Sequence, residues 1–531
     1  MKIDCSALVP SACLPAGITD PRVIDCFTRR FNAATRQGIV LPETHTNNGD
    51  EGYADKCGTY SKCIKQDSPG KVNITAFNAF RAATLSGDFA AYEHLTLGGT
   101  RRLNGPMASY SYAFTGADGS QFGNATVAIP PKLNSDQYAT ELIELYWCSL
   151  LRDVAFTDYP SSAIAQDAAT ELSGAADYKG PKDGGTVTPA LLFRGGFSGE
   201  DIGPYVSQFL LTPTNFGSAA FSQKYTTYVS NIDYMIDLDT WSAVQNGAPT
   251  GQVNQKDSTP RFLHDGRGLA AYTHVDELYQ AYFTAYLVLN SIMPSPPLNP
   301  GNPYLKSTTQ MGFGTFNGPD FAAVLGQVAK LALNSCWYQK WVVHLRHRPE
   351  SGGGLVHLIR SGIDTSFNAQ PLDRALYSSA VAQSFATYQT YLLSQPFPEG
   401  SPSHPAYPTG HGAVGGACIT ALKFFFDGDY VLNNPQMPTS DGTTITPWNY
   451  DPAIGKPGIL TVNGELHKLA HNITFGHGLH GGIHWRSDSD ASMMLGEAVA
   501  IRFFEDLVCT YAEPIDITIT KLDGKKHNFK N

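Results

Sequence analysis

The segment SPSHPAYPTGHGAVGGACITALKFFF, from Ser401 to Phe426, decides how the rest of the chain is interpreted. Its two central prolines cannot lie inside a helix, so they hold the approach extended. Thr409, Gly410 and His411 follow, and small residues then lead into an apolar helix. A hydroxyl, a glycine amide and an imidazole at a helix N-terminus suit a tetrahedral oxyanion, because the first amides are unpaired and the helix dipole favours negative charge. A plain loop entering a buried helix is the competing interpretation.

A second stretch, WYQKWVVHLRHRPE from Trp337 to Glu350, adds positive charge and closes a helix expected at 319–345. Lys340 and Arg348 lie about two helical turns apart, so they point in roughly the same direction. Lysine as a compact charge and arginine as a planar fork are the usual pair for a phosphate-like ion. A solvated basic helix end is the alternative.

A third stretch, FGHGLHGGIHWRSD from Phe475 to Asp488, is rich in glycine and histidine. Histidine is the commonest metal ligand and titrates near neutral pH. Asp488 lies one turn after His484 and could hold that ring by its second nitrogen. Three histidines could instead suggest zinc, although no nearby carboxylate or thiolate pattern matches a zinc motif. Each histidine taken alone is also compatible with a structural role.

Together, the three stretches resemble the vanadium-dependent haloperoxidases and their relatives, the type-2 phosphatidic acid phosphatases. The matching residues are Lys340, Arg348-Pro349, Thr409-Gly410-His411, His484 and Asp488. The spacing from Lys340 to Arg348 is similar to that of the algal and bacterial bromoperoxidase branch. The resemblance includes longer segments, such as ELYWCSLLRDVAFTDY from Glu144 to Tyr159, and it covers most of the chain from about residue 77 onward.

Carried over position by position, the resemblance implies a vanadate site. A ring nitrogen of His484 would bind vanadium axially. The equatorial oxygens of vanadate would accept hydrogen bonds from Lys340, Arg348, the Thr409 hydroxyl and the Gly410 amide.

The resemblance also implies catalytic and supporting residues. His411 would be the acid–base histidine beside the apical oxygen. His404 falls where bromoperoxidases carry histidine, and Trp337 matches a tryptophan found near the proposed halide position in some members. Asp276 matches a carboxylate that braces the arginine of the third motif, and Asp488 supports the axial histidine.

Relatives in this family carry an arginine in the third motif, six residues before the axial histidine. This chain departs from that pattern. Six residues before His484 the chain has Gly478, and aligning the Phe-Gly pair puts His477 at this position instead. Losing a guanidinium removes a permanent charge and two directed donors. The loss corresponds to roughly 1.5–3 kcal/mol, or about one to two powers of ten in vanadate affinity. His477 could compensate only when protonated, so we expect tighter vanadate binding below neutral pH.

Composition and pattern predict a mainly α protein. The 531 residues are 42% hydrophobic, which is enough to bury a large core, and no linker supports cutting the chain into several domains. The resemblance implies two four-helix bundles in one large α-helical domain, with long wrapping loops and minor β hairpins. Helices are expected near 268–292, 319–345, 373–395, 412–426, 465–475 and 487–508. A strand is expected at 459–462, and the polar tail from residue 521 onward is expected to fray.

The first residues differ from the rest. We expect a Cys-rich N-terminal arm over residues 1–72 and a haloperoxidase-like helical domain over 73–531. Cysteines crowd the arm, at Cys5, Cys13, Cys26, Cys57 and Cys63. We favour a disulfide-stapled arm in a secreted, cell-wall or periplasmic protein whose leader lies outside this sequence, over a reduced cytoplasmic one. The remaining cysteines, at positions 148, 336, 418 and 509, are expected to be core thiols.

Charge and hydropathy exclude some partners. The net charge is −10 and no long basic run occurs, which argues against nucleic acid. No apolar run reaches the length needed to span a membrane.

The activity implied by the resemblance is that of a vanadate-dependent bromoperoxidase. Hydrogen peroxide would oxidise bromide or iodide to a hypohalous-type electrophile, which halogenates a small organic acceptor. Two alternatives stay open: an acid phosphatase of the same superfamily, and an inactive relative that binds vanadate or phosphate. The resemblance further implies a homo-oligomer, a dimer or larger. A structural calcium ion is left open, because the sequence does not fix it.

Overall fold

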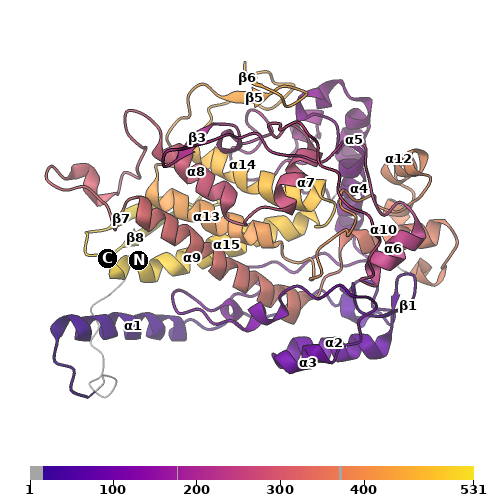
Figure 1. Ribbon diagram of the computed structural model, residues 1–531, viewed down its shortest axis with the longest axis horizontal. Helices are drawn as coiled ribbons and strands as arrows, with labels where there is room; N and C mark the ends of the chain where they lie inside the picture. The colour runs from indigo at the N-terminus through magenta and orange to yellow at the C-terminus, as the bar shows by residue number, and fades with distance from the viewer. Residues whose placement is uncertain (1–15, 176, 370–372) are drawn as a thin grey trace.

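The computed structural model describes residues 16–175, 177–369 and 373–531, and helices dominate them (Figure 1). The mainly α prediction is confirmed. The α-helices are α1 (Pro21–Ile39), α2 (Ile74–Ser86), α3 (Phe89–Glu93), α4 (Asp136–Leu150), α5 (Ala163–Gly174), α6 (Leu238–Gln245), α7 (Gly266–His274), α8 (Gln280–Asn290), α9 (Gly318–Tyr338), α10 (Pro349–Arg360), α11 (Asp373–Leu376), α12 (Ser379–Tyr388), α13 (Gly410–Phe425), α14 (Val462–Phe475) and α15 (Arg486–Leu507).

The strands form short antiparallel hairpins at the periphery. They pair as β1 (Gln66–Ser68) with β2 (Lys71–Val72), β3 (Thr214–Phe216) with β4 (Ala219–Phe221), β5 (Gln436–Pro438) with β6 (Ile445–Pro447), and β7 (Asp516–Thr520) with β8 (Lys526–Lys530). Two expectations were wrong. Residues 459–462 form no strand, because the Thr461 side chain caps α14 by accepting from the Gly464 amide. The C-terminal tail is not frayed, because β8 pairs with β7 along its whole length.

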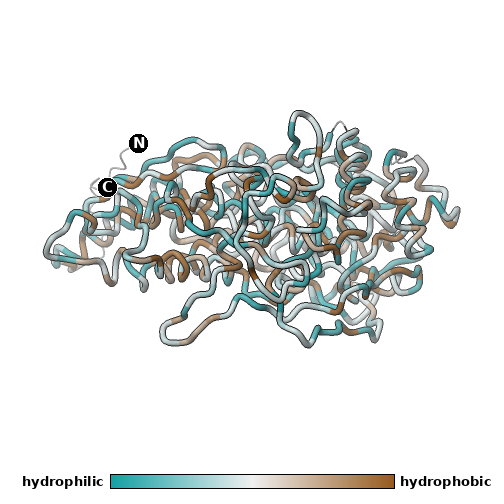
Figure 2. Tube along the Cα trace, turned by 90° about the horizontal axis from the view of Figure 1, so that it is seen from above, coloured by the Kyte–Doolittle hydropathy of each residue, from teal (hydrophilic) through white to brown (hydrophobic). Residues whose placement is uncertain are grey.

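The helices gather in two groups that lie side by side (Figure 1). In one group, α9, α14 and α15 pack around α13. In the other, α5, α10, α11 and α12 pack around α4. Apolar and polar stretches alternate along the chain, as Figure 2 shows. Among the described residues, no helix combines the length and apolar character that crossing a bilayer requires.

Glycines let α13 and α15 touch through their backbones. A Cβ atom on Gly416 would lie 2.0 Å from the carbonyl oxygen of Met493. A Cβ atom on Gly496 would lie 2.0 Å from the carbonyl oxygen of Ala413. Any larger side chain at these two positions would push the helices apart. The close contact fixes the N-terminus of α13, which carries His411, beside the start of α15, which follows His484.

The cysteines differ from the sequence prediction. Cys26, Cys57 and Cys63 are free thiols, so the described part of the N-terminal region contains no disulfide between them. Cys5 and Cys13 lie outside the described residues. Cys509 is disulfide-bonded, and its assignment as a plain core thiol was therefore wrong. The division of the chain at residue 72 stays a prediction, although Tyr60 and Ile64 pack in the main hydrophobic core.

Candidate functional site

The three candidate stretches meet at one buried point. The Arg348 guanidinium donates through Nη1 to His484 Nε2 at 2.9 Å, and its Nη2 lies 3.0 Å from His404 Nδ1. The Lys340 ammonium donates to the carbonyl oxygens of residues 405 and 406, at 2.9 and 2.8 Å. Segments that are far apart in the sequence therefore converge as predicted.

Two π-helical turns carry the site residues Lys340 and His477. Helix α9 continues into a π-helical turn over Gln339–His344, which contains Lys340 and ends at Leu345 in the left-handed conformation, with φ 43°. Helix α14 likewise continues into a π-helical turn over Gly476–His480, which contains His477. A π turn accommodates an extra residue within a helix, so it reorients the side chains that follow, and such turns are frequent at functional sites.

His484 is held with one ring nitrogen available. Its Nδ1 donates to Asp488 Oδ2 at 3.0 Å, which leaves Nε2 as the acceptor facing Arg348. Asp488 is held in turn by Arg346, whose Nη1 donates to Oδ1 at 2.6 Å. Arg346 also forms an ion pair with Glu141. A neutral imidazole with a fixed tautomer and an unprotonated Nε2 is the form that binds a metal.

His411 sits at the start of α13 and donates through Nε2 to Asp276 Oδ1 at 2.9 Å. The resemblance matches Asp276 to a carboxylate that braces the third-motif arginine in relatives; this chain has no arginine there, and the carboxylate holds His411 instead. The His411 ring also packs against His477, with 3.9 Å between ring centroids. Because Asp276 takes Nε2, the other ring nitrogen of His411 is the one left to exchange a proton within the pocket.

The third-motif position carries no guanidinium. A Cβ atom on Gly478 would lie 3.1 Å from the Cβ of His484, so a larger residue fits there only if the turn adjusts. His477 lies nearby instead, 5.6 Å from His484 between ring centroids. Burial lowers the pKa of His477 well below its usual range, and the neighbouring histidines and Arg348 lower it further. At neutral pH His477 therefore offers a hydrogen-bonding group but no charge.

The site carries positive charge that the protein does not balance. Among the described residues, neither Lys340 nor Arg348 forms an ion pair with a carboxylate, although both are at most 1% exposed. Burial lowers the pKa of Lys340 to about 7, and the Arg348 guanidinium adds to this effect. Burial also lowers the pKa of Arg348 to about 10. Buried cations without a counter-charge are costly, which indicates a place for a bound anion.

Buried polar atoms without a partner also indicate a bound anion. The Thr409 hydroxyl and His477 Nδ1 are buried and have no hydrogen-bond partner within the described chain. Gly410 begins α13, and a helix leaves its first amides unpaired. A tetrahedral or trigonal-bipyramidal oxyanion would satisfy these donors together with the two cations, so the residues fit vanadate.

His404 and Trp337 form one wall. Their rings lie 4.7 Å apart between centroids, and the Lys340 ammonium lies 5.6 Å from the Trp337 ring. Burial lowers the pKa of His404 well below its usual range, and Arg348 and Lys340 contribute to the shift. The halide role predicted for this wall is not tested by its geometry and stays a prediction.

One histidine of the third stretch lies outside the site. His480 Nε2 is 2.9 Å from the Tyr205 hydroxyl and its Nδ1 is 3.2 Å from the Cys148 sulfur. Among the described residues, no group of three or more His, Cys, Asp or Glu side chains could hold a metal ion, so the zinc alternative has no support there.

Arg346, which donates to Asp488, was not identified from the sequence motifs. The only sequence signal for it is its place two residues before Arg348 in the run Arg346-His-Arg348.

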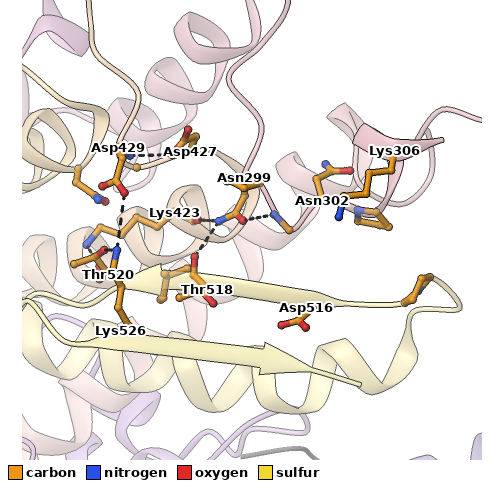
Figure 3. Close-up of a pocket in the computed structure, with 17 residues that line it drawn as sticks. Asn299, Asn302, Lys306, Lys423, Asp427, Asp429, Asp516, Thr518, Thr520 and Lys526 are labelled. Carbon is orange, nitrogen blue, oxygen red and sulfur yellow. Dashed lines mark hydrogen bonds and ion pairs between the residues drawn. The ribbon is translucent and has the colours of Figure 1, made fainter. Parts of the chain in front are cut away.

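A cavity of about 710 Å³ lies elsewhere, between the end of α13 and the β7–β8 hairpin (Figure 3). Two of its lysines have polar contacts. Lys423 lies 2.7 Å from His467 Nε2 and donates to the Thr520 carbonyl, and Lys526 faces Asp429 at 3.9 Å. Three aspartates line this cavity beside its three lysines, so its charge is mixed, unlike that of the anion site.

Known proteins share this architecture over nearly the whole chain. Residues 321–510 match the family described as the VCPO second helical-bundle domain. The chain is 32% identical over 513 residues to a vanadium-dependent bromoperoxidase of Ascophyllum nodosum, covering 92% of this chain and 89% of that one. A vanadium-dependent bromoperoxidase of Corallina officinalis is 29% identical over 570 residues, covering 92% and 93%.

A solved structure is similar over the same extent. It is the homohexameric structure of the second vanadate-dependent bromoperoxidase from Ascophyllum nodosum. It superimposes with a TM-score of 0.88 at 28% identity, covering 99% of this chain and 94% of that chain.

Proposed function

Since the chain belongs to the vanadium-dependent haloperoxidases, in their bromoperoxidase branch, we propose that it is a vanadate-dependent bromoperoxidase. It uses hydrogen peroxide to oxidise bromide, and iodide, to a hypohalous-type electrophile that halogenates organic acceptors. The observation that carries the proposal is the approach of Arg348 to His484 Nε2 at 2.9 Å. Beside it lies Lys340, a second buried cation that donates to carbonyl oxygens and not to a carboxylate.

Vanadate, when bound, supplies a Lewis acid that activates hydrogen peroxide without a change of valence. His484 would hold the vanadium through Nε2, with Asp488 keeping that nitrogen unprotonated. Lys340, Arg348, the Thr409 hydroxyl and the Gly410 amide would bind the oxygens, and their positive charge would stabilise developing negative charge. This arrangement supports the roles carried over from the family.

His411 would take a proton from hydrogen peroxide and return one later, as a positioned general base and acid. Asp276 would orient the ring by accepting from Nε2. His477 would contribute a hydrogen bond where relatives carry arginine. His404 and Trp337 would form the wall against which bromide approaches, in keeping with their position beside Arg348 and Lys340.

The proposal is tested with two assays on the same preparation. Bromination of a dione acceptor is followed with peroxide, bromide and vanadate, and nitrophenyl phosphate hydrolysis is followed in parallel. Bromination that depends on vanadate and is lost in His484→Ala supports the proposal. Hydrolysis without bromination favours the phosphatase, for which His484 would be the nucleophile and His411 the acid.

Tight vanadate binding with neither activity favours the inactive relative. The missing third-motif guanidinium is the observation behind the inactive relative, because its absence removes one positive charge from the site for the dianion. A calcium ion receives no support from the side-chain groups of the described residues.

We further propose that the protein forms a homo-oligomer, as the homohexameric relative does. Light scattering coupled to gel filtration tests this directly. A mass equal to that of one 57.4 kDa chain at micromolar concentration would contradict it.

A further inference from the structure

A second cavity, of about 410 Å³, opens beside the site and is called the acceptor pocket here. Its walls are mostly apolar, and they include Ala248, Pro249, Val253 and Pro398. The polar side chains among its lining residues include those of Arg101 and Glu399. A concave, mainly apolar pocket of this size with few polar groups is typical of sites for small organic molecules.

Arg101 supplies a positive charge in this pocket, which the Glu399 carboxylate also lines. Its Nη1 donates to the backbone carbonyl of Glu399 at 2.8 Å, and no carboxylate of the described chain forms an ion pair with it. The Glu399 carboxylate is engaged by His274 at 2.6 Å. The nearby ammonium of Lys62 is likewise engaged, by Glu350 at 2.6 Å. Arg101 is therefore left as a planar donor for a carboxylate.

The pocket is tied to the vanadate site by short stretches of chain. Glu399 is five residues from His404, so their Cα atoms are at most about 18 Å apart. Arg101 is three residues from Asn104, whose carbonyl accepts from the Trp337 indole at 3.3 Å. The Ser403 hydroxyl, next to His404, donates to the carbonyl of residue 102 at 2.5 Å. These links place the acceptor pocket next to the wall formed by His404 and Trp337.

We propose that the acceptor pocket binds aromatic carboxylates with an electron-rich ring, and that it holds them for bromination. The carboxylate would pair with Arg101 and the ring would lie against the apolar wall. This inference rests on the proposed function, which supplies hypobromous acid at the neighbouring vanadate site.

The chemical step is an electrophilic aromatic substitution. A ring carbon attacks the bromine of hypobromous acid, so a C–Br bond forms and the Br–O bond breaks. The hydroxide that leaves takes the proton from the same ring carbon, and the products are the aryl bromide and water. The carbon is oxidised and the bromine is reduced to the bromide level.

Binding is measured first, in the absence of peroxide. The vanadate-loaded protein is titrated with 4-hydroxybenzoate by calorimetry, beside 4-hydroxybenzyl alcohol, which lacks the charge. We expect Arg101→Gln to weaken 4-hydroxybenzoate binding about ten-fold or more and to leave the alcohol nearly unaffected. Arg102→Gln is the matched control, because that exposed neighbour contributes only its backbone carbonyl. Arg101→Lys, which keeps the charge, should lose less than Arg101→Gln.

Bromination is then measured with each variant's own rate of bromide oxidation as reference. Arg101→Gln should raise KM for 4-hydroxybenzoate about ten-fold relative to Arg102→Gln. Equal KM and equal affinity in the two variants would overturn the acceptor pocket, even if bromide is oxidised. Conversely, binding of 4-hydroxybenzoate that depends on Arg101 in a protein that oxidises no bromide would refute the proposed function, while the binding part of this inference would stand.

Discussion

At the scale of single residues, the decisive property of the site is uncompensated positive charge. Lys340 and Arg348 are buried, and their hydrogen bonds go to carbonyl oxygens and histidine nitrogens instead of carboxylates. Desolvating a charge without pairing it costs several kcal/mol or more. Such residues persist in a folded protein when a ligand restores the balance, so these two cations indicate that the site binds an anion.

Replacing Arg348 by glutamine should lower vanadate affinity by about ten- to a hundred-fold, since a charge-assisted hydrogen bond contributes roughly 1.5–3 kcal/mol. Vanadate that binds only the folded state raises its melting temperature by mass action. The measurement is therefore the vanadate-induced shift in melting temperature of the variant and the parent. A shift of equal size in both would contradict the assigned role.

Replacing Asp276 by asparagine should lower the bromination rate at saturating vanadate by about ten- to a hundred-fold, because the ring of His411 loses its orienting carboxylate. Vanadate affinity should change far less, since Asp276 contacts the acid–base histidine and not a proposed vanadate ligand. Glu277→Gln, at an exposed neighbouring position, is the control. A loss confined to vanadate affinity would place Asp276 in cofactor binding instead.

At the scale of secondary-structure elements, most of the helices could be predicted from the sequence and their irregular ends could not. Apolar spacing and capping residues predict α9, α13 and α15 within a few residues. The π-helical turns after α9 and α14 leave no such signal, because they depend on how the following segments pack. For the same reason the sequence suggested a two-turn spacing between Lys340 and Arg348, whereas an intervening left-handed residue, Leu345, brings them to the site.

Helix α14 carries a buried ionic group whose titration should appear in the stability of the protein. His471 Nδ1 contacts Glu200 and its Nε2 lies 3.2 Å from Asp490 Oδ1. Burial lowers the pKa of His471, but the two carboxylates outweigh it and raise the pKa from 6.5 to about 9. A histidine with a raised pKa stabilises the folded state fully below about pH 6.5, and this contribution disappears as the pH rises through about 9.

His471→Gln should therefore destabilise the protein more at about pH 6 than at about pH 9.5, with a difference of roughly 2–4 kcal/mol in the free energy of unfolding. Chemical denaturation at both pH values is the measurement. His527→Gln, at a partly exposed histidine 4.0 Å from Glu505, should show little pH-dependent difference. A destabilisation of His471→Gln that is the same at both pH values would rule out the charged pair.

At the scale of the whole molecule, buried ion pairs join the two helix groups behind the site. Arg346 connects Asp488, at the start of α15, with Glu141 of α4. Arg486 similarly bonds Glu144 of α4, at 2.5 Å. The sequence alone could identify the ligand residues through their motifs. It could not reveal these braces, nor the contact between Asp276 and His411, because a partner's identity depends on the packing of distant segments.

Arg346→Met should destabilise the fold by about 3–5 kcal/mol, because it leaves two buried carboxylates without their cation. Arg374→Met, which removes an exposed pair with Asp136 at 3.6 Å, should change the unfolding free energy by no more than about 1 kcal/mol. Denaturant titration of both variants without vanadate is the measurement. Similar stability losses in the two would mean that the ion pairs behind the site do not hold the helix groups together.

The bond from His411 to Asp276 has a practical consequence for anyone who would shorten this protein. The stretch 321–510 contains all the proposed vanadate ligands, so a gene fragment limited to it would encode every one of them. Yet Asp276, Glu141 and Glu144 are encoded upstream, so the excised piece would keep its basic groups while losing the acidic ones that steady them. Miniaturised versions should therefore carry grafted substitutes for those carboxylates.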